Sequence, residues 1–127
     1  MELLTRTEEK VMLILWDMEK CLVKDIIDHL DPKPPYNTIS SVVRLLENKE
    51  FVDHKAYGKT YEYFPKIEKH DYARFKLERL AEHYFHGSYS EMVRFVATEK
   101  DLHIDAIIEI DDNENAPKIN YRDGYAF

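Results

Sequence analysis

Residues 34–52 form a segment with two chemically different faces. At the 100° per residue of an α-helix, its apolar side chains gather on one face, the pattern of a helix lying on a core. The opposite face lacks the mixed glutamates and lysines that cover most solvated helices. It offers small hydroxyl and amide groups around one guanidinium, so it presents many hydrogen-bonding atoms with little bulk. The apolar face has Ile39, Val42, Val43 and Leu46, and the polar face has Asn37, Ser40, Ser41, Arg44 and Asn48.

Such polar groups match the hydrogen-bonding edges of bases in the DNA major groove. Asn can bridge adenine N6 and N7, Arg can grip guanine O6 and N7, and Ser or Thr can contact a base or a phosphate. Arg44 is the best candidate for a strong base or phosphate contact. The alternative is that Ser40 and Ser41 are only solvated, and that Asn37 caps a helix starting one residue later. The candidate DNA contacts on this helix are Tyr36, Asn37, Thr38, Ser40, Ser41 and Arg44.

Two shorter helical patterns precede this segment. The first begins at the capping box formed by Thr5 and Glu8 and continues to about residue 19. The second covers roughly residues 22–30, where the proline-rich stretch 31–35 ends it. The polar-faced helix, from about 36 to 49, is therefore the third.

A β-hairpin is predicted directly after the third helix. The hydrophobic period changes from 3.6 to 2 in "FVDHK" and "TYEYF", and Gly58 suits the turn between them. Three helices followed by a hairpin is the order of a winged helix-turn-helix, whose recognition helix lies in the major groove. Near the turn, the side chains expected to meet backbone phosphates are Lys55, Tyr57 and Lys59.

The C-terminal half is predicted to be helical. We expect helices at about 68–86, from Ser88 onward and at about 103–110. They carry more apolar surface than they can easily bury alone, so packing against a second copy is favoured over folding back on the first half. The chain is thus mainly α with a small hairpin, divided into a winged-helix domain 1–66, a dimerisation region 67–110 and a tail 111–127. The predicted dimerisation residues are Leu77, Leu80, Tyr84, Met92, Phe95, Ile104, Ile107 and Ile108.

Composition limits the function classes. The net charge is −7, but residues 32–66 hold 6 Lys/Arg against 4 Asp/Glu, a local net of +2. Charge therefore neither excludes nor proves nucleic-acid binding. One cysteine excludes an internal disulfide, and the longest apolar run, Val11–Trp16, is too short to insert in a membrane, so a cytoplasmic protein is expected. No phosphate-binding loop or catalytic motif is present, which argues against an enzyme, and neither a cofactor nor a metal ligand set is predicted.

Several separated motifs resemble the penicillinase/methicillin-resistance repressor family (BlaI/MecI type). The opening "LTRTEEKVMLILW" is similar to the family signature L/I-S/T-x-x-E-x-x-x-M-x-x-x-W. "TISSVVRLLENKEFVDHK" resembles its recognition helix and first wing strand, and "YGKTYEYFP" resembles its wing. "GSYSEMVRFVATEKDL" resembles the start of its dimerisation unit, so the similarity extends from residue 4 to about 110. The signature residues here are Leu4, Thr5, Glu8, Met12 and Trp16.

The resemblance implies a homodimeric repressor of a resistance or stress operon, bound to a palindromic operator. In that family a membrane-bound sensor protease triggers cleavage of the repressor in the dimerisation region. The corresponding bond here is Arg94–Phe95, although Arg94 replaces the asparagine of the best-known cleavage sites. Glu50 also departs from the family, standing where a glycine usually precedes the wing.

Other interpretations remain open at this stage. The fold is compatible with a winged-helix protein-protein interaction module that does not bind DNA. A ligand-responsive regulator would need a small aromatic molecule in a dimer interface lined by Tyr72, Phe75, Tyr84 and Phe85. Cys21 is expected to be buried, but Lys20 and Lys24 nearby leave a redox sensor with a lowered pKa as a weaker alternative.

Overall fold

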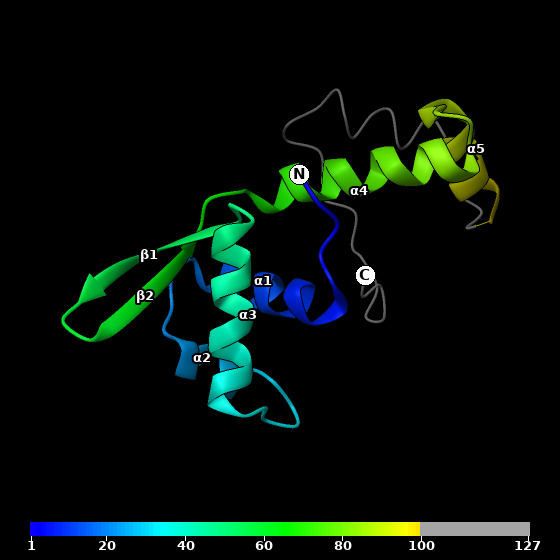
Figure 1. Cartoon of the computed structure of the whole chain (residues 1–127). Helices are drawn as coiled ribbons and strands as arrows, with labels where there is room; N and C mark the ends of the chain where they lie inside the picture. The colour runs from blue at the N-terminus through cyan, green and yellow to red at the C-terminus, as the bar shows by residue number, and fades with distance from the viewer. Residues whose placement is uncertain (100–127) are drawn as a thin grey trace, which may run out of the picture. The chain divides into compact units, whose positions relative to one another are not determined.

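The computed structural model describes residues 1–99 of the chain (Figure 1). Within them, helices dominate and the strands form an antiparallel hairpin, which confirms the predicted fold class. A first compact unit comprises Met1–Glu78, and a second begins at Arg79. The predicted helix 103–110, with Ile104, Ile107 and Ile108, and the tail 111–127 lie outside the described residues. The elements are α1 (Arg6–Met18), α2 (Val23–Asp28), α3 (Tyr36–Asn48), β1 (Val52–Tyr57), β2 (Thr60–Pro65), α4 (Lys69–Tyr84) and α5 (Tyr89–Glu99).

The start of α1 is fixed by the predicted capping box. Thr5 Oγ1 accepts a hydrogen bond from the Glu8 N–H at 3.2 Å, and Glu8 Oε1 accepts one from the Thr5 N–H at 2.8 Å. These bonds satisfy two backbone donors that the first turn would leave open. One turn from its end, α1 is tied to the chain before α4, because Trp16 Nε1 donates to the Ile67 carbonyl at 2.8 Å.

The N-termini of α2 and α3 lack the side-chain cap that Thr5 gives α1. The helix α2 is shorter than predicted, because Leu22 is an extended capping residue whose N–H donates to Asp25 Oδ2 at 2.9 Å. The helix α3 begins at Tyr36 as predicted, and the residue before it, Pro35, is extended and gives no side-chain cap. Asn37 is therefore inside the first turn of α3 and is not its cap.

The hairpin β1–β2 pairs Val52 with Pro65 at its base and Tyr57 with Thr60 at its tip. Gly58 in the turn has φ 63°, the left-handed conformation that glycine adopts without strain. Cys21 extends this small sheet, because its N–H and carbonyl exchange hydrogen bonds of 3.0 and 2.9 Å with Tyr63. The wing is thus anchored to the segment between α1 and α2.

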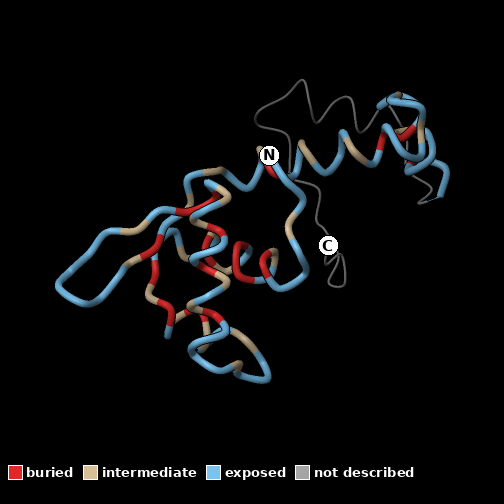
Figure 2. The backbone as a smooth tube through the Cα atoms, viewed as in Figure 1, coloured by how far each residue is buried: buried red, intermediate tan, exposed pale blue. Residues whose placement is uncertain are grey.

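A single core holds the first unit together. Figure 2 shows the buried backbone concentrated in α1, the inner side of α3 and the base of the hairpin. Phe51 is the largest fully buried side chain, and its ring meets that of Tyr72 from α4 edge-on at 5.7 Å. The core residues are Val11, Met12, Leu15, Cys21, Val23, Ile26, Ile39, Val43, Leu46, Phe51, Val52, Tyr63 and Tyr72.

Among the described residues, Glu8 is the buried charged side chain of this core, with 3% of its surface exposed. Lys49, next after α3, places its Nζ 2.9 Å from the Glu8 carboxylate. Burial acts to raise the pKa of Glu8, but hydrogen bonds from Thr5 and Lys49 outweigh it, so that pKa lies below the usual value. The pair therefore links the start of α1 to the end of α3 only while Glu8 is ionised.

Glu8→Gln should destabilise the first unit by about 1–3 kcal/mol near neutral pH, because Lys49 and the cap lose a charged partner. Since the folded pKa of Glu8 is depressed, its contribution is present above the usual glutamate pKa and is lost as pH falls through the folded value. The urea stabilities of wild type and variant should therefore converge as the pH falls below the ordinary glutamate pKa and through the lowered pKa of Glu8. Asp17→Asn, exposed on α1, is the control, and a pH-independent difference would contradict this explanation.

The helices α4 and α5 are joined by a tight turn. Gly87, with φ 77°, donates its N–H to the Ala81 carbonyl at 2.8 Å, which closes the end of α4 as predicted. Ser88 Oγ then accepts the Glu91 N–H at 3.1 Å and caps α5. The rings of Phe85 and Phe95 lie 5.4 Å apart across the turn. No helix among the described residues is long and apolar enough to span a bilayer.

Candidate nucleic-acid interface

The polar face of α3 is open to solvent, as its pattern predicts. The opposite face is in the core, with Ile39, Val43 and Leu46 exposing at most 1% of their surface. Asn37 and Ser41 are one turn apart, and Ser41 Oγ donates to the backbone carbonyl of Asn37 at 2.8 Å. The side chain of Asn37 is exposed. The exposed polar side chains of α3 are Tyr36, Asn37, Thr38, Ser41, Arg44 and Asn48, with Ser40 half-buried.

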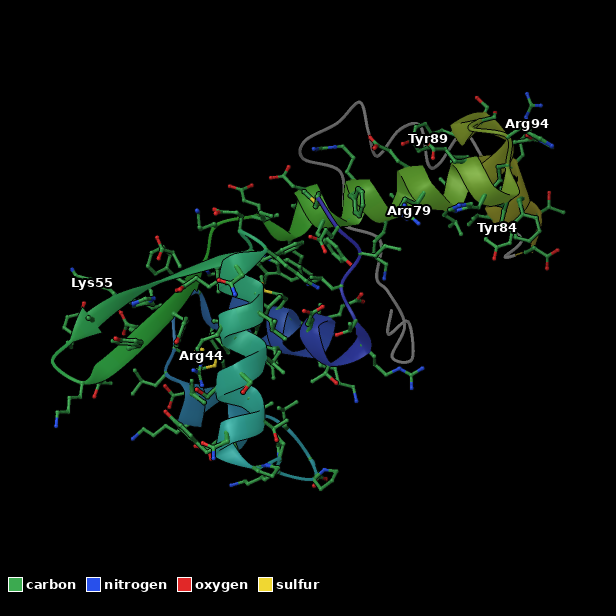
Figure 3. The ribbon with its side chains drawn as sticks, in the orientation of Figure 1. Arg44, Lys55, Arg79, Tyr84, Tyr89 and Arg94 are labelled. Carbon is green, nitrogen blue, oxygen red and sulfur yellow. The ribbon has the colours of Figure 1, made fainter. Side chains whose placement is uncertain are left out.

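Arg44 lies on the side of α3 that is nearer the hairpin (Figure 3). Its Nη2 is 3.3 Å from Ser40 Oγ, and its Nε is 3.4 Å from the Ser40 carbonyl. These contacts hold the guanidinium of Arg44 against Ser40, one turn closer to the start of α3. It still has donors free for an external acceptor, because guanidinium carries five N–H groups.

The predicted wing residues lie at the exposed end of the hairpin. Lys55 Nζ sits 5.5 Å from the centre of the Tyr57 ring, a cation–π contact that holds both side chains together. Tyr57 is 54% exposed, and Lys59 follows Gly58 in the turn. The structure thus places an exposed cationic and aromatic tip beside the polar helix, within the same compact unit.

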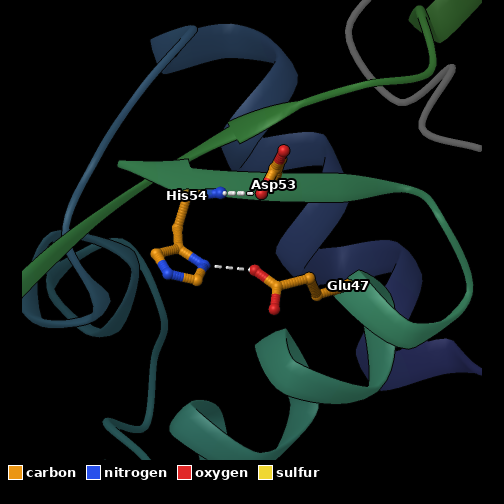
Figure 4. A group of neighbouring side chains, drawn as sticks. All are labelled: Glu47, Asp53 and His54. Atoms are coloured by element: carbon orange, nitrogen blue, oxygen red, sulfur yellow. Dashed lines mark hydrogen bonds and ion pairs between the residues drawn. The ribbon is translucent and has the colours of Figure 1, made fainter. Parts of the chain in front are cut away.

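Sequence reasoning missed a group that joins α3 to β1 (Figure 4). His54 Nδ1 is hydrogen-bonded to the Glu47 carboxylate, and the His54 ring stacks on Tyr61 with ring centroids 4.3 Å apart. Asp53 Oδ1 accepts the backbone N–H of His54 at 2.8 Å. One ligand atom from each of Glu47, Asp53 and His54 lies within 4.8 Å of the others, so these residues could hold a metal ion. The hydrogen bond between Glu47 and His54 also links α3 to β1.

Cys21 is not the redox-sensitive thiol that its lysine neighbours suggested. Its side chain is 3% exposed, inside the core and beside β2. Burial, together with the charges of Asp25 and Glu62, raises the pKa of the Cys21 thiol to about 11. The thiol is therefore protonated and covered at physiological pH, and it acts as a small core residue.

The predicted dimerisation residues differ in exposure within one chain. Leu77, Leu80, Tyr84 and Phe95 are 42–74% exposed, whereas Met92 is 8% exposed and packs inside its own unit. Arg94, at the proposed cleavage bond, is exposed in the middle of α5. Tyr72 cannot line a ligand pocket between subunits, because it is buried in the first unit and its hydroxyl accepts the Leu4 N–H at 2.9 Å. The interpretation that used Tyr72 in such a pocket is therefore wrong for that residue.

Helices α1–α3, the hairpin that follows them and the open polar face of α3 define a winged helix-turn-helix protein. A solved structure that covers most of the chain has a similar fold. A chain of the hsRosR-S4 complex shares 20% identity, with coverage of 84% of this chain and 92% of that one and a TM-score of 0.51. The solution structure of the DNA-binding domain of the repressor BlaI shares 24% identity, with coverage of 54% and 87% and a TM-score of 0.49.

Comparison of the sequence with family models identifies the chain more closely. The model of the penicillinase repressor family matches residues 4–113, and the chain belongs to that family. A search of curated protein sequences found no match to the chain. The chain is therefore a transcriptional regulator with a winged-helix DNA-binding fold, as the resemblance in its sequence predicts.

Proposed function

We propose that the protein is a homodimeric, sequence-specific repressor that binds a palindromic operator in the cytoplasm and catalyses no reaction. The observation that carries this proposal is the open polar row of α3 beside the wing, in a member of a repressor family. The row carries the short hydroxyl and amide side chains of Asn37, Ser41 and Asn48, which suit the hydrogen-bonding edges of bases, with Leu45 exposed beside them. Asn37, Ser41 and Asn48 are the base-reading candidates, and the wing lysines supply charge for phosphates.

Dimerisation is supported by the apolar side chains left uncovered on α4 and α5. Leu77, Leu80 and Tyr84 occupy neighbouring turns of α4, and each exposes more than 40% of its surface. A row of large exposed apolar residues on one helix is unusual for a monomer and favours an interface. A second copy of the chain would cover this apolar row through a symmetric interface. It would also supply the second recognition helix for a palindromic site.

The proposals for the regulated genes and for the inducing signal are supported by family membership. We propose a resistance or stress operon, with inactivation by a membrane-bound sensor protease at Arg94–Phe95. Arg94 is exposed in the single chain, which supports protease access at this bond. Cleavage within α5 would weaken dimerisation, and operator affinity would fall because both half-sites must be held at once.

Fluorescence anisotropy with the promoter region of the protein's own gene tests the proposal. Asn37→Ala and Asn48→Ala should each cost about 1–3 kcal/mol of specific binding and should leave affinity for unrelated duplex DNA unchanged. The control is Asp17→Asn, which alters an exposed polar group on α1 far along the sequence from α3. If the wild-type protein shows no salt-sensitive DNA binding, the repressor proposal is rejected and a protein-protein interaction module is favoured.

A further inference from the structure

A groove of about 560 Å³ lies between α3, the start of α2 and the wing. Its α3 side is a row one turn apart, formed by Tyr36, Ser40 and Arg44. This row is distinct from the row of Asn37, Ser41 and Asn48, which is turned further from the hairpin. The remaining lining residues are Leu22, Val23, Lys24, Lys59, Thr60, Tyr61 and Tyr63.

The groove is cationic although the chain as a whole carries a net charge of −7. Lys24, Arg44 and Lys59 line it, and no carboxylate does. The carboxylate of Glu47, on the turn of α3 beyond Arg44, is engaged by His54. Hydroxyl groups of Ser40 and Thr60 add neutral donors between the cations. Charged donors and hydroxyls around one opening are the ligands that a phosphate group takes in proteins.

Arg44 is already turned toward this groove. Its hydrogen bonds to Ser40 hold the guanidinium against a residue that lines the groove, one turn back along α3. To grip a phosphate between α3 and the wing, Arg44 keeps these contacts and uses its remaining donors.

We propose that this groove binds one phosphate group of the DNA backbone in each half-site, and that Arg44 is a backbone contact that does not read bases. Lys24 and Lys59 complete the site from α2 and the wing turn. The inference rests on the proposed DNA-binding function and assigns base reading to Asn37, Ser41 and Asn48. It also adds Lys24 to the interface, a residue that the sequence analysis considered only as a neighbour of Cys21.

Anisotropy titrations over a range of salt concentrations test the assignment. Arg44→Gln, Lys24→Gln and Lys59→Gln should each weaken operator and unrelated duplex DNA by the same factor. Each should also lower the slope of log K against log salt by about 1, the value of one lost phosphate contact. Lys10→Gln, at an exposed position of α1, is the control and should leave the slope unchanged.

Two results separate the failure of this inference from failure of the proposed function. If Arg44→Gln lowers operator affinity but leaves unrelated DNA and the salt slope unchanged, Arg44 reads a base and the inference is overturned while the repressor stands. If the wild-type protein shows no salt-sensitive binding to the operator or to unrelated DNA, the proposed function fails and the inference fails with it.

A second experiment identifies the source of the phosphate. Single methylphosphonates, which lack the backbone charge, are placed in turn along the operator. One position in each half-site should weaken wild-type binding and should weaken the Arg44→Gln variant no further, as expected for a coupled pair. In parallel, inorganic phosphate and adenosine monophosphate are titrated against the DNA-free protein by NMR. Tight binding of either, with no methylphosphonate effect, would assign the groove to a free phosphate compound and overturn the inference.

Discussion

Leu80→Glu should lower operator affinity at least about a hundredfold and leave the first compact unit folded. Leu80 lies on α4 between the exposed side chains of Leu77 and Tyr84, and 42% of its surface is open in one chain. A carboxylate at this position would be buried without a partner if two copies met there, which prevents association. A monomer holds one half-site at a time and loses the effective concentration of the second, worth about 10²–10⁴ in affinity.

Analytical ultracentrifugation and anisotropy on the same samples measure both consequences. His83→Glu is the matched control, because it adds the same carboxylate to an exposed position of α4 outside the row of Leu77, Leu80 and Tyr84. The control should stay dimeric and bind the operator normally. If Leu80→Glu also stays dimeric, the interface is elsewhere and the proposed dimerisation surface is rejected.

Local features of this fold could be predicted from the sequence because each depends on neighbouring residues. The capping box at Thr5 and the turn at Gly58 lie where the residue types require them, and Gly87 is left-handed in the turn that follows α4. The periodicity of α3 likewise separated its buried face from its polar face. These predictions needed no knowledge of what packs against each element.

Contacts between distant segments could not be predicted in the same way. Glu8 and Lys49 are 41 positions apart, and nothing in either neighbourhood indicates that they pair. The lining of one groove by Lys24, Arg44 and Lys59 depends on how α2, α3 and the wing pack together. Periodicity fixes the face on which a residue lies, but the partner on that face is set by tertiary structure.

Glu50 is an intermediate case. The family usually has glycine there, and the structure gives Glu50 a φ of 67°, the left-handed conformation that favours glycine after a helix. The departure from the family pattern therefore marks a backbone requirement that this chain meets with a non-glycine residue. The position of the turn was readable from the resemblance, whereas the ion pair of Glu50 with Lys66 was not.

Phe51→Ala should destabilise the first unit by about 3–5 kcal/mol, the usual cost of removing a fully buried aromatic ring. Phe51 has no exposed surface, and its ring lies against Tyr72. Its backbone also links α3 to the end of the hairpin, because its N–H donates to the Leu46 carbonyl at 2.9 Å and its carbonyl accepts from the Lys66 N–H at 2.8 Å. A loss of this size is a large part of the 5–15 kcal/mol that typically stabilises a domain.

Urea denaturation should show a lower midpoint with an unchanged slope, which reports lost stability without a change in the surface exposed on unfolding. Phe51→Leu keeps most of the buried volume and should cost less than about 1.5 kcal/mol. In conditions where Phe51→Ala stays folded, operator affinity should still fall, because Phe51 packs at the junction between α3 and β1. Unrelated duplex DNA should be affected less, since backbone contacts tolerate a shifted helix better than base contacts do. Equal stability of the alanine and leucine variants would show that the ring of Phe51 does not support this junction.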